Sequence, residues 1–335
     1  MSRRGGTGSV YQDDQDGYDR PARHTKPRTK DRPDYSKLDV ARVVTIDRGR
    51  YRCVIDGRAV SATKGRSLGR TSVIVGDLVR LAGDTSGEPG TLARIVEALE
   101  RRTVLRRTAD DDDPYERAIV ANADQLVIVT ALADPPPRMG MIDRILIAAY
   151  DAGIDPLLCL TKSDLEDPSE LIAAYEPLGV PIVVTRIGME LAELRSYLDD
   201  HVSVLVGHSG VGKSTLVNAL IPSAHRATGV VNDVTGRGRH TSSAAIALEL
   251  PNGTGWVVDT PGVRSFGLSH VDPRNVLASF SDLAELSEDC PRGCTHAATE
   301  PECALDAAVA DGRLQPERLA SFRRIQVADH SDRSN

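Results

Sequence analysis

The pattern of apolar and polar positions first shows short β-branched runs separated by turn signals such as Asp56-Gly57 and Gly76-Asp77. Several short strands with turns between them are typical of a small barrel or sandwich. Five strands in about 60 residues favour a β-barrel of the OB type. The predicted strands are Val40–Ile46, Tyr51–Ile55, Arg58–Ala62, Ser72–Val75 and Leu78–Leu81.

Beyond Pro114 the pattern alternates between strand and helix. Continuous apolar runs are typical of strands buried on both faces. Met139–Ala152, between the first two runs, has helical spacing, so we expect an α/β domain with a parallel sheet. The runs lie at Gln125–Leu132, Pro156–Thr161, Val180–Thr185 and Val202–Gly207. Toward the end of the chain we expect short helices, including Cys303–Ala310 and Pro316–Val327.

The chain of 335 residues therefore divides into a multidomain arrangement. We expect a basic tail at 1–36, the OB-type barrel and a linker at 37–107, the α/β domain at 108–270 and a helical domain at 271–335. The tail has almost no apolar side chains and cannot bury enough surface to offset the entropy of ordering, so we expect it to be disordered.

Charge is unevenly distributed along the chain. The net charge is −7, yet residues 1–107 carry 23 Lys and Arg against 14 Asp and Glu, or +9, which leaves −16 for the remainder. Such asymmetry suggests that the basic end meets a polyanion. Arg20–Arg32 contains six basic residues and one Asp. This stretch is either an arm that grips nucleic-acid phosphates or a plain solvated tail.

Further basic residues lie in and after the barrel region. Tyr51 is its only aromatic residue, so charge and backbone contacts explain RNA binding better than base stacking does. The candidates are Arg48, Arg50, Arg52, Lys64, Arg66 and Arg70, and the same surface is expected to continue through Arg101, Arg102, Arg106 and Arg107.

Several classes of protein are excluded. No apolar run approaches the roughly 18 residues of a transmembrane helix, and the first residues contain no apolar segment of a secretory signal. We therefore expect a cytoplasmic protein without a membrane partner. The odd number of cysteines, five, argues against a disulfide scaffold.

One motif predicts a phosphate-binding loop. Residues 207–214 match G-x-x-x-x-G-K-[ST], follow an apolar strand and open a predicted helix at Lys213–Leu220. In such a loop the backbone N–H groups and the helix N-terminus cradle phosphate oxygens, Lys213 reaches the β- and γ-phosphates and Ser214 ligates Mg²⁺. The predicted nucleotide contacts here are Gly207, His208, Ser209, Gly210, Val211, Gly212, Lys213, Ser214 and Thr215.

Two further segments predict that the γ-phosphate is sensed. Asp259 ends a predicted strand, Trp256–Asp259, where its carboxylate can hold the Mg²⁺ shell, and the N–H of Gly262 can contact the γ-phosphate. Thr241 lies in a Gly-containing stretch, 224–243, and is a candidate Mg²⁺ ligand. Two loops that contact the γ-phosphate are the switch arrangement of GTPases.

A fourth segment predicts guanine recognition. Asp164 can accept hydrogen bonds from the N1–H and the exocyclic amine of guanine, which adenine does not offer. In ordinary GTPases this motif follows the phosphate loop, whereas here Lys162 precedes Lys213 by 51 residues. The order predicts a circularly permuted P-loop GTPase. The motif reads Thr161, Lys162, Ser163 and Asp164.

A cysteine and histidine cluster predicts a metal site. Three thiols and one imidazole fall within 14 residues, a donor set that suits one structural tetrahedral Zn²⁺. The alternative is a set of reduced cysteines in a small core. The predicted ligands are Cys290, Cys294, His296 and Cys303.

In its order of motifs the chain resembles the small ribosomal subunit biogenesis GTPases, the RsgA or YjeQ family. The resemblance covers roughly residues 38–327 and comprises the barrel, T-K-S-D-L, G-x-S-G-V-G-K-S-T-L-x-N, G-R-G-R-H-T, D-T-P-G and the Cys/His cluster. It implies a circularly permuted GTPase with a zinc site that binds the 30S subunit late in assembly and hydrolyses GTP slowly until the subunit stimulates it.

Two departures from the family pattern concern the guanine site. Thr161 stands where the family usually has an Asn that braces the phosphate loop, so the brace is either weakened or supplied by the hydroxyl. The family's Ser-Ala loop that backs the base reads Thr185-Arg186 here. Because Asp164 is present, we expect guanine preference to be retained.

The catalytic residues follow from the same segments. Val263 stands where many GTPases carry a water-orienting Gln, so slow intrinsic turnover is expected. His240 is the nearest candidate to orient water, a role that the resemblance supports. The alternative is a loop histidine that contacts RNA or caps a turn. The predicted catalytic set is His240, Lys213 and Thr241, with Ser214, Thr241 and Asp259 as ligands of Mg²⁺.

The leading hypothesis is a monomeric GTP hydrolase that times late 30S assembly, with GTP and GDP as substrate and product, Mg²⁺ and one Zn²⁺ as cofactors, and 16S rRNA within the 30S subunit as partner. One alternative is a permuted GTPase acting on another RNA or protein assembly. A second is a binding module that uses GTP with little catalysis. An ATP-using P-loop kinase is disfavoured by Asp164 and the two switch segments.

Overall fold

The computed structural model describes residues 34–69, 71–108, 116–222, 245–251, 253–260 and 273–332. The chain divides into two units, residues 1–36 and 37–335, and the description below concerns the second. Nearly all of the predicted disordered tail lies outside the described residues.

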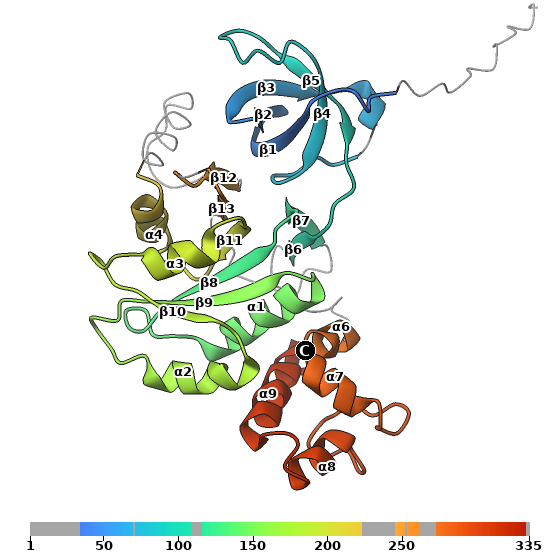
Figure 1. Ribbon diagram of the computed structural model, residues 1–335, viewed down its shortest axis with the longest axis vertical. Helices are drawn as coiled ribbons and strands as arrows, with labels where there is room; N and C mark the ends of the chain where they lie inside the picture. Colours follow the sequence, from blue (N-terminus) through green and yellow to red (C-terminus); the bar gives the residue numbers. More distant parts are fainter. Residues whose placement is uncertain are drawn as a thin grey trace, which may run out of the picture. The chain divides into compact units, whose positions relative to one another are not determined.

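Five strands form the closed barrel that the sequence predicts (Figure 1). Their order around the barrel is β1-β2-β3-β5-β4, with β3 and β5 parallel and the other pairs antiparallel. The predicted strand at 72–75 is wrong, because only Val75 makes an isolated bridge there, and the missing strand is β5. The strands are β1 (Val40–Asp47), β2 (Arg50–Ile55), β3 (Arg58–Lys64), β4 (Leu78–Gly83) and β5 (Ala93–Ala98), with a short 3-10 helix η1 (Arg66–Leu68) after β3.

Strand β1 serves two apolar cores. Its pairing with β2 shifts register between Val43 and Thr45. A bulge of this kind re-aims neighbouring side chains. Val43 is buried in the barrel core with Cys53 and Ile95, whereas Val44 joins the core of the α/β sheet.

The α/β domain is a six-stranded sheet of order β10-β9-β8-β11-β13-β12. All neighbouring pairs are parallel except β12 with β13, which is antiparallel. The predicted parallel sheet is confirmed, and the antiparallel edge strand was not predicted. Every residue of β8 is buried, as its apolar sequence requires. The strands are β8 (Gln125–Ala131), β9 (Asp155–Thr161), β10 (Ile182–Val184), β11 (Val202–Val206), β12 (Ile246–Glu249) and β13 (Trp256–Asp259).

The helices of this domain connect its parallel strands (Figure 1). They are α1 (Met139–Asp151), α2 (Ser169–Tyr175), α3 (Ala192–Leu198) and α4 (Lys213–Leu220), with a 3-10 turn η2 (Glu176–Leu178) after α2. An antiparallel pair, β6 (Val104–Thr108) and β7 (Glu116–Ala121), lies between barrel and sheet in the sequence and was not predicted.

Two arginines of the expected phosphate-facing surface form ion pairs with carboxylates of the fold. Arg101 Nε lies 2.7 Å from Oδ1 of the fully buried Asp77, and Arg102 Nη2 lies 3.0 Å from Asp124 Oδ1. Arg106 is exposed, whereas Arg70 and the side chain of Arg107 lie outside the described residues.

In the described C-terminal residues, 273–332, four helices follow the sheet, which confirms the expected helical C-terminal part (Figure 1). Phe280 and Phe322 pack edge to face at 5.5 Å between ring centroids. In the part of the chain that the structure describes, no helix is long and apolar enough to cross a membrane. The helices are α6 (Pro273–Ala278), α7 (Ser281–Ser287), α8 (Ala304–Ala310) and α9 (Pro316–Asp332).

Helix α9 is attached to the α/β domain through Arg324. Its guanidinium lies 3.3 Å from the carboxylate of Asp143 on α1 and 4.8 Å from the ring centroid of Tyr175. The hydroxyl of Tyr175 donates to Asp143 at 3.0 Å. Asp143 is nearly fully buried, so these contacts offset the cost of its desolvation.

Replacing Arg324 with methionine should destabilise the fold by roughly 1–3 kcal/mol, because the buried Asp143 carboxylate loses its cationic partner. Burial raises the pKa of Asp143 and Arg324 opposes that rise. A raised pKa means that the folded state binds the proton more tightly than the unfolded chain does. The loss of stability should therefore be largest near neutral pH and shrink as the pH falls toward the ordinary Asp value of 3.8. Thermal unfolding followed by circular dichroism measures this dependence.

The control adds Asp143→Asn to the Arg324→Met variant, which removes the titrating group while keeping its shape. The double variant should lose the pH dependence. A deficit that is the same at every pH in the single variant would contradict the pairing.

Candidate functional site

The predicted phosphate loop lies between β11 and α4, where close packing requires glycine. Gly207 has φ of +150°, and a Cβ there would lie 2.1 Å from the carbonyl oxygen of Val129 on β8. Gly212, with φ of +96°, immediately precedes α4 in the left-handed region that favours glycine. Both glycines are therefore demanded by the backbone path, and the loop leads directly into the N-terminus of α4.

Lys213, at the start of α4, and Asp259, at the end of β13, interact electrostatically. The Lys213 ammonium donates to the carbonyl of His208 at 2.8 Å and to that of Gly207. Burial lowers the pKa of Lys213 and the nearby Asp259 opposes that shift, while burial raises the pKa of Asp259 and Lys213 opposes it. Each of the two charges thus partly offsets the effect of burial on the other. Ser214 and Thr215 are exposed in the first turn of α4.

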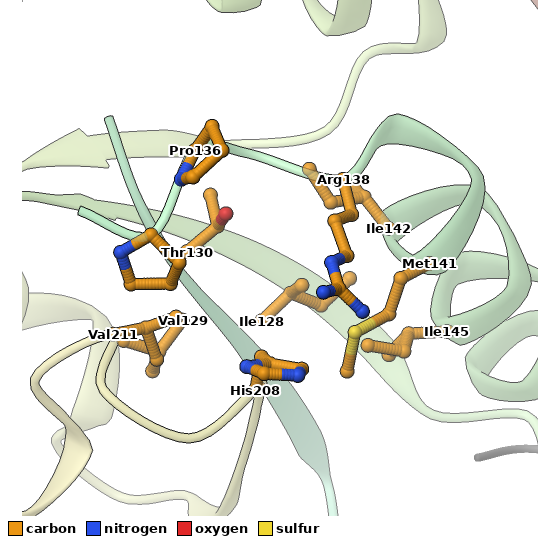
Figure 2. Close-up of a pocket in the computed structure, with 12 residues that line it drawn as sticks. Ile128, Val129, Thr130, Pro136, Arg138, Met141, Ile142, Ile145, His208 and Val211 are labelled. Atoms are coloured by element: carbon orange, nitrogen blue, oxygen red, sulfur yellow. The ribbon is translucent and has the colours of Figure 1, made fainter. Parts of the chain in front are cut away.

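A small cavity of about 20 Å³ lies behind the loop (Figure 2). It is lined by residues of β8, by Met141 and Ile145 of α1, and by His208 and Val211 of the loop. This volume holds about one water molecule. The side chain of His208 therefore packs between the loop and α1, and its Nδ1 lies 2.9 Å from the Ser209 carbonyl oxygen.

The hydroxyl of Thr161 joins the predicted guanine loop to the phosphate loop. It lies 2.6 Å from the Val211 carbonyl oxygen and 3.3 Å from that of Thr130. The Thr161 side chain is buried, so this contact is shielded from water. The sequence left open whether Thr161 weakens the brace of the phosphate loop or supplies it through its hydroxyl. The structure shows the hydroxyl in contact with the phosphate loop.

The rest of the guanine motif is held by β10 and the loop after β8. Ser163 N–H donates to the Thr185 carbonyl at 3.2 Å, and Thr185 N–H donates to the Leu160 carbonyl at 2.7 Å. Lys162, with φ of +59°, donates from its ammonium to the Asp134 carbonyl. The carboxylate of Asp164 is exposed and makes no hydrogen bond to the described residues, so it is available to a ligand.

Sequence reasoning missed three residues that support these loops. The carbonyls of Thr130 and Asp134 accept the contacts of Thr161 and Lys162, and nothing in their side chains signals this. Thr260, which is 2% exposed, has its Oγ1 2.8 Å from the Leu205 carbonyl oxygen and so ties the end of β13 to β11. The position of Thr260 within the Asp-Thr-Pro-Gly motif could have indicated this role from the sequence.

Three predicted residues, His240, Thr241 and Gly262, lie outside the described residues. Their geometry is therefore not part of the site described here, and Val263 falls in the same group.

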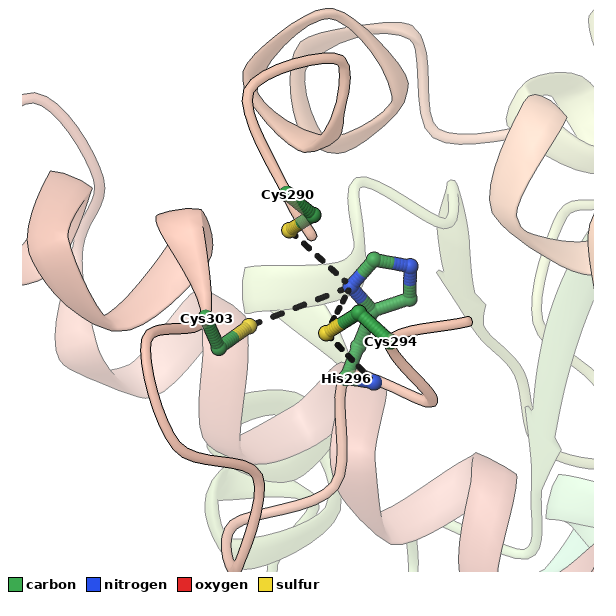
Figure 3. Close-up of side chains that lie close together, drawn as sticks. All are labelled: Cys290, Cys294, His296 and Cys303. Atoms are coloured by element: carbon green, nitrogen blue, oxygen red, sulfur yellow. Dashed lines mark hydrogen bonds between the residues drawn. The ribbon is translucent and has the colours of Figure 1, made fainter. Parts of the chain in front are cut away.

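The four predicted metal ligands converge around one point (Figure 3). His296 Nδ1 lies 3.5, 3.6 and 3.8 Å from the sulfurs of Cys290, Cys294 and Cys303. A tetrahedral zinc ion, with Zn–S of about 2.3 Å and Zn–N of about 2.0–2.1 Å, would separate sulfur and nitrogen by about 3.5–3.6 Å. The donor atoms therefore fit Zn²⁺ in both type and spacing.

Backbone contacts fix the loop that carries these ligands. Arg323 on α9 donates to the His296 carbonyl at 2.8 Å and forms a two-pronged ion pair with Asp306 on α8. The N–H of Ala304 lies 3.3 Å from the Cys290 sulfur. Such contacts orient metal ligands and stabilise thiolate charge.

The sheet order and the two loops define the class of protein. A phosphate loop after β11, a lysine- and aspartate-bearing loop after β9, and their joining by Thr161 reproduce a GTPase site in permuted chain order. The fold is accordingly that of a circularly permuted GTPase preceded by a barrel. Comparison with known proteins identifies the family.

The family model of the RsgA GTPase matches residues 98–269. The chain is 43% identical over 263 residues to "Small ribosomal subunit biogenesis GTPase RsgA" of Pseudomonas aeruginosa, covering 76% of this chain and 75% of that protein. It is 42% identical over 264 residues to the protein of the same name in Azotobacter vinelandii, covering 76% and 74%. The chain belongs to the RsgA GTPase family and is a GTP hydrolase.

Solved structures agree with this assignment. YjeQ from Thermotoga maritima superposes with a TM-score of 0.66 at 26% identity, covering 89% of this chain and 99% of that chain. YloQ, described as a circularly permuted GTPase, gives a TM-score of 0.65 at 24% identity, covering 90% and 98%, and supports the fold alone.

Replacing Thr161 with valine should weaken GDP and GTP binding about fivefold, which corresponds to about 1 kcal/mol for a lost hydrogen bond. Valine keeps the shape of threonine but leaves the Val211 carbonyl without its donor. Titration of a fluorescent GDP analogue measures the affinity. Thr161→Ser retains the hydroxyl and serves as the control, with affinity within about twofold of wild type. Equal affinities for the valine and serine variants would contradict the brace.

Proposed function

We propose that this chain hydrolyses GTP during late assembly of the small ribosomal subunit, binding the maturing 30S particle in its GTP form and leaving it after hydrolysis. The observation that carries the proposal is the Thr161–Val211 hydrogen bond, which unites base-reading and phosphate-binding loops into one site. The names of the relatives supply the subunit as the partner.

Each predicted residue has a definite task in hydrolysis. The Lys213 ammonium, already held by two loop carbonyls, meets the β- and γ-phosphates, and its positive charge offsets the charge that spreads over the phosphate oxygens. The backbone N–H groups of 207–215 cradle the phosphates. Asp164 selects guanine by accepting from the base's N1–H and amino group, and Thr161, Lys162, Ser163 and Thr185 hold its loop.

The oxygen donors at the mouth of the loop suit magnesium. Ser214 and Asp259, with Thr241, would hold Mg²⁺, which neutralises charge on the transferring phosphate. The raised pKa of Asp259 in the protein alone reflects a buried carboxylate whose charge is only partly balanced by Lys213. A carboxylate in that condition favours a cation beside it.

The nucleophile is a water molecule that attacks the γ-phosphorus while the bond to the β-phosphate oxygen breaks, giving GDP and inorganic phosphate. His240 orients this water and Gly262 donates its N–H to the γ-phosphate. Val263 has no group that could hold water, so hydrolysis is slow until the partner brings His240 into position.

The barrel offers a surface for 16S rRNA. Arg50 and Arg52 are both exposed on β2, and their neighbours in register on β3, Thr63 and Ser61, are hydroxyl residues. Guanidinium and hydroxyl groups side by side suit phosphate and ribose oxygens. The protein acts as a monomer in the cytoplasm, where its partner is assembled.

The Cys290, Cys294, His296 and Cys303 cluster holds one structural Zn²⁺. Four protein donors complete the tetrahedral shell, so the ion stabilises the helical C-terminal part and takes no direct part in hydrolysis.

Purified 30S subunits should raise the rate of GTP hydrolysis at least tenfold, with no comparable rise for ATP. His240→Ala should lose about a hundredfold of the stimulated rate, which is typical of losing a group that positions or deprotonates water, while GTP affinity stays within about twofold. Single-turnover hydrolysis and nucleotide titration measure the two effects separately.

Lys213→Ala is the matched control, because it should lose nucleotide binding together with hydrolysis. Unchanged GTPase activity in the presence of 30S subunits would remove the ribosome from the proposal. Stimulation that survives in His240→Ala would instead leave the ribosome in place and remove the catalytic role of His240.

Cys303→Ser should release the bound zinc and lower the melting temperature by at least about 5 °C, because metal binding at such a site contributes folding free energy. Elemental analysis gives the zinc content and thermal unfolding gives the stability. Cys53→Ser, which removes a buried thiol outside the cluster, should keep the zinc. A wild-type protein purified without zinc and equally stable would contradict the structural metal.

A further inference from the structure

A polar cleft of about 580 Å³ lies at the amino ends of the sheet strands, at the opposite end of β11 from the phosphate loop. Asp155 begins β9, Trp256 begins β13, and Asp200 lies just before β11. Arg42 of the barrel strand β1 and Arg102 also line it. We call it the amino-end cleft. None of its residues belongs to the nucleotide or metal sites.

Two arginines line the cleft, and one of them is paired with a carboxylate. Arg102 is neutralised by Asp124 at 3.0 Å. Arg42 stacks its guanidinium over the indole of Trp256, 5.8 Å from the ring centroid. Its Nη1 is buried and has no hydrogen-bond partner among the described residues. This nitrogen is enclosed by the protein, so the Arg42 guanidinium is only partly available to a ligand in the cleft.

Carboxylates also line the cleft. The carboxylates of Asp155 and Asp200 are exposed, and neither makes an ion pair or hydrogen bond to the described residues. The neighbouring His201 has its Nδ1 2.7 Å from the Asp199 carbonyl oxygen. Two free carboxylates against one guanidinium give the cleft a surplus of negative charge.

We propose that the amino-end cleft binds an extended, arginine- or lysine-rich peptide segment of a partner protein. Basic side chains of the peptide pair with Asp155 and Asp200. The apolar edge of Trp256 packs against the aliphatic part of a long basic side chain. An RNA strand fits less well, since its phosphates would face both carboxylates.

The inference rests on the proposed function only in taking the partner to be a protein of the small subunit. Its test needs no ribosome. Trp256 is the only tryptophan of the chain, so its fluorescence reports directly on the cleft. The full-length protein, saturated with GDP and Mg²⁺, is titrated with a short peptide of alternating arginine and glycine, and separately with an oligouridine of similar length.

The peptide should shift the Trp256 emission, and the oligouridine should leave it unchanged. Replacing both carboxylates, Asp155→Asn with Asp200→Asn, should weaken peptide binding roughly threefold to thirtyfold through the loss of two exposed ion pairs. Asparagine tolerates the left-handed backbone of Asp200, whose φ is +62°, and so preserves the fold. Each single variant should show part of the loss.

The matched control is Glu170→Gln with Glu193→Gln, which removes the same two negative charges from exposed positions on α2 and α3. Its peptide affinity should stay within about twofold of wild type. Equal weakening in both double variants would reduce the effect to net charge and overturn the proposal. An emission shift with oligouridine that strengthens when Asp155 and Asp200 are replaced would assign the cleft to RNA and also overturn it.

The outcome is separable from that of the proposed function. If the peptide does not bind while 30S subunits still stimulate GTP hydrolysis, this inference is wrong and the proposed function stands. If the peptide binds but 30S subunits do not stimulate GTP hydrolysis, the peptide site in the cleft is supported and the small subunit is no longer the proposed partner.

Discussion

The nucleotide site depends on how closely two loops approach the central strand β8. Gly207 packs against the carbonyl of Val129. The Thr161 hydroxyl donates to the Val211 carbonyl and lies 3.3 Å from the carbonyl oxygen of Thr130. Strand β8 carries none of the predicted nucleotide contacts, yet its backbone is the platform on which the phosphate loop and the base loop meet. A Cβ at 207 would press on backbone rather than on a flexible side chain, and backbone at the centre of a buried sheet cannot give way.

Permutation of the chain order is compatible with this site because parallel strands present their carboxyl ends at one edge of the sheet, whatever the order of their connections. Its mechanical consequence lies after β13, where the chain continues into α6–α9 instead of returning to the sheet. Two consecutive arginines of α9 connect this helical part to the rest of the protein. Arg323 holds the loop of His296, and Arg324 holds Asp143 on α1, the helix that follows β8. Two neighbouring residues of α9 thus link the loop that carries the predicted zinc ligands to the helix that follows β8.

The residues whose chemistry depends on local spacing could be predicted from the sequence, and those that depend on packing could not. The Cys290 to Cys303 cluster and the helix Lys213–Leu220 are visible because their spacing alone carries the signal. Strand β12 pairs antiparallel at the sheet edge, and its four residues show too little periodicity to identify. Arg101 was misjudged because a surface arginine and one that pairs with the buried Asp77 look alike in sequence. The sequence Gly76-Asp77 indicates only a turn, so it gives no sign that Asp77 is buried and pairs with Arg101.

The sequence suggests separate domains, but the apolar core does not respect their boundaries. A single cluster of buried side chains runs from Val44 of the barrel through the sheet to Phe322 of α9. Because side chains alternate between the two faces of a strand, Val43 and Val44 of β1 enter different cores. The same strand places Arg42 on Trp256 of β13, the strand that leads in sequence to Gly262. The barrel is therefore packed against the sheet through Val44 and Arg42, and the strand that Arg42 contacts ends at Asp259, one of the residues predicted to hold Mg²⁺.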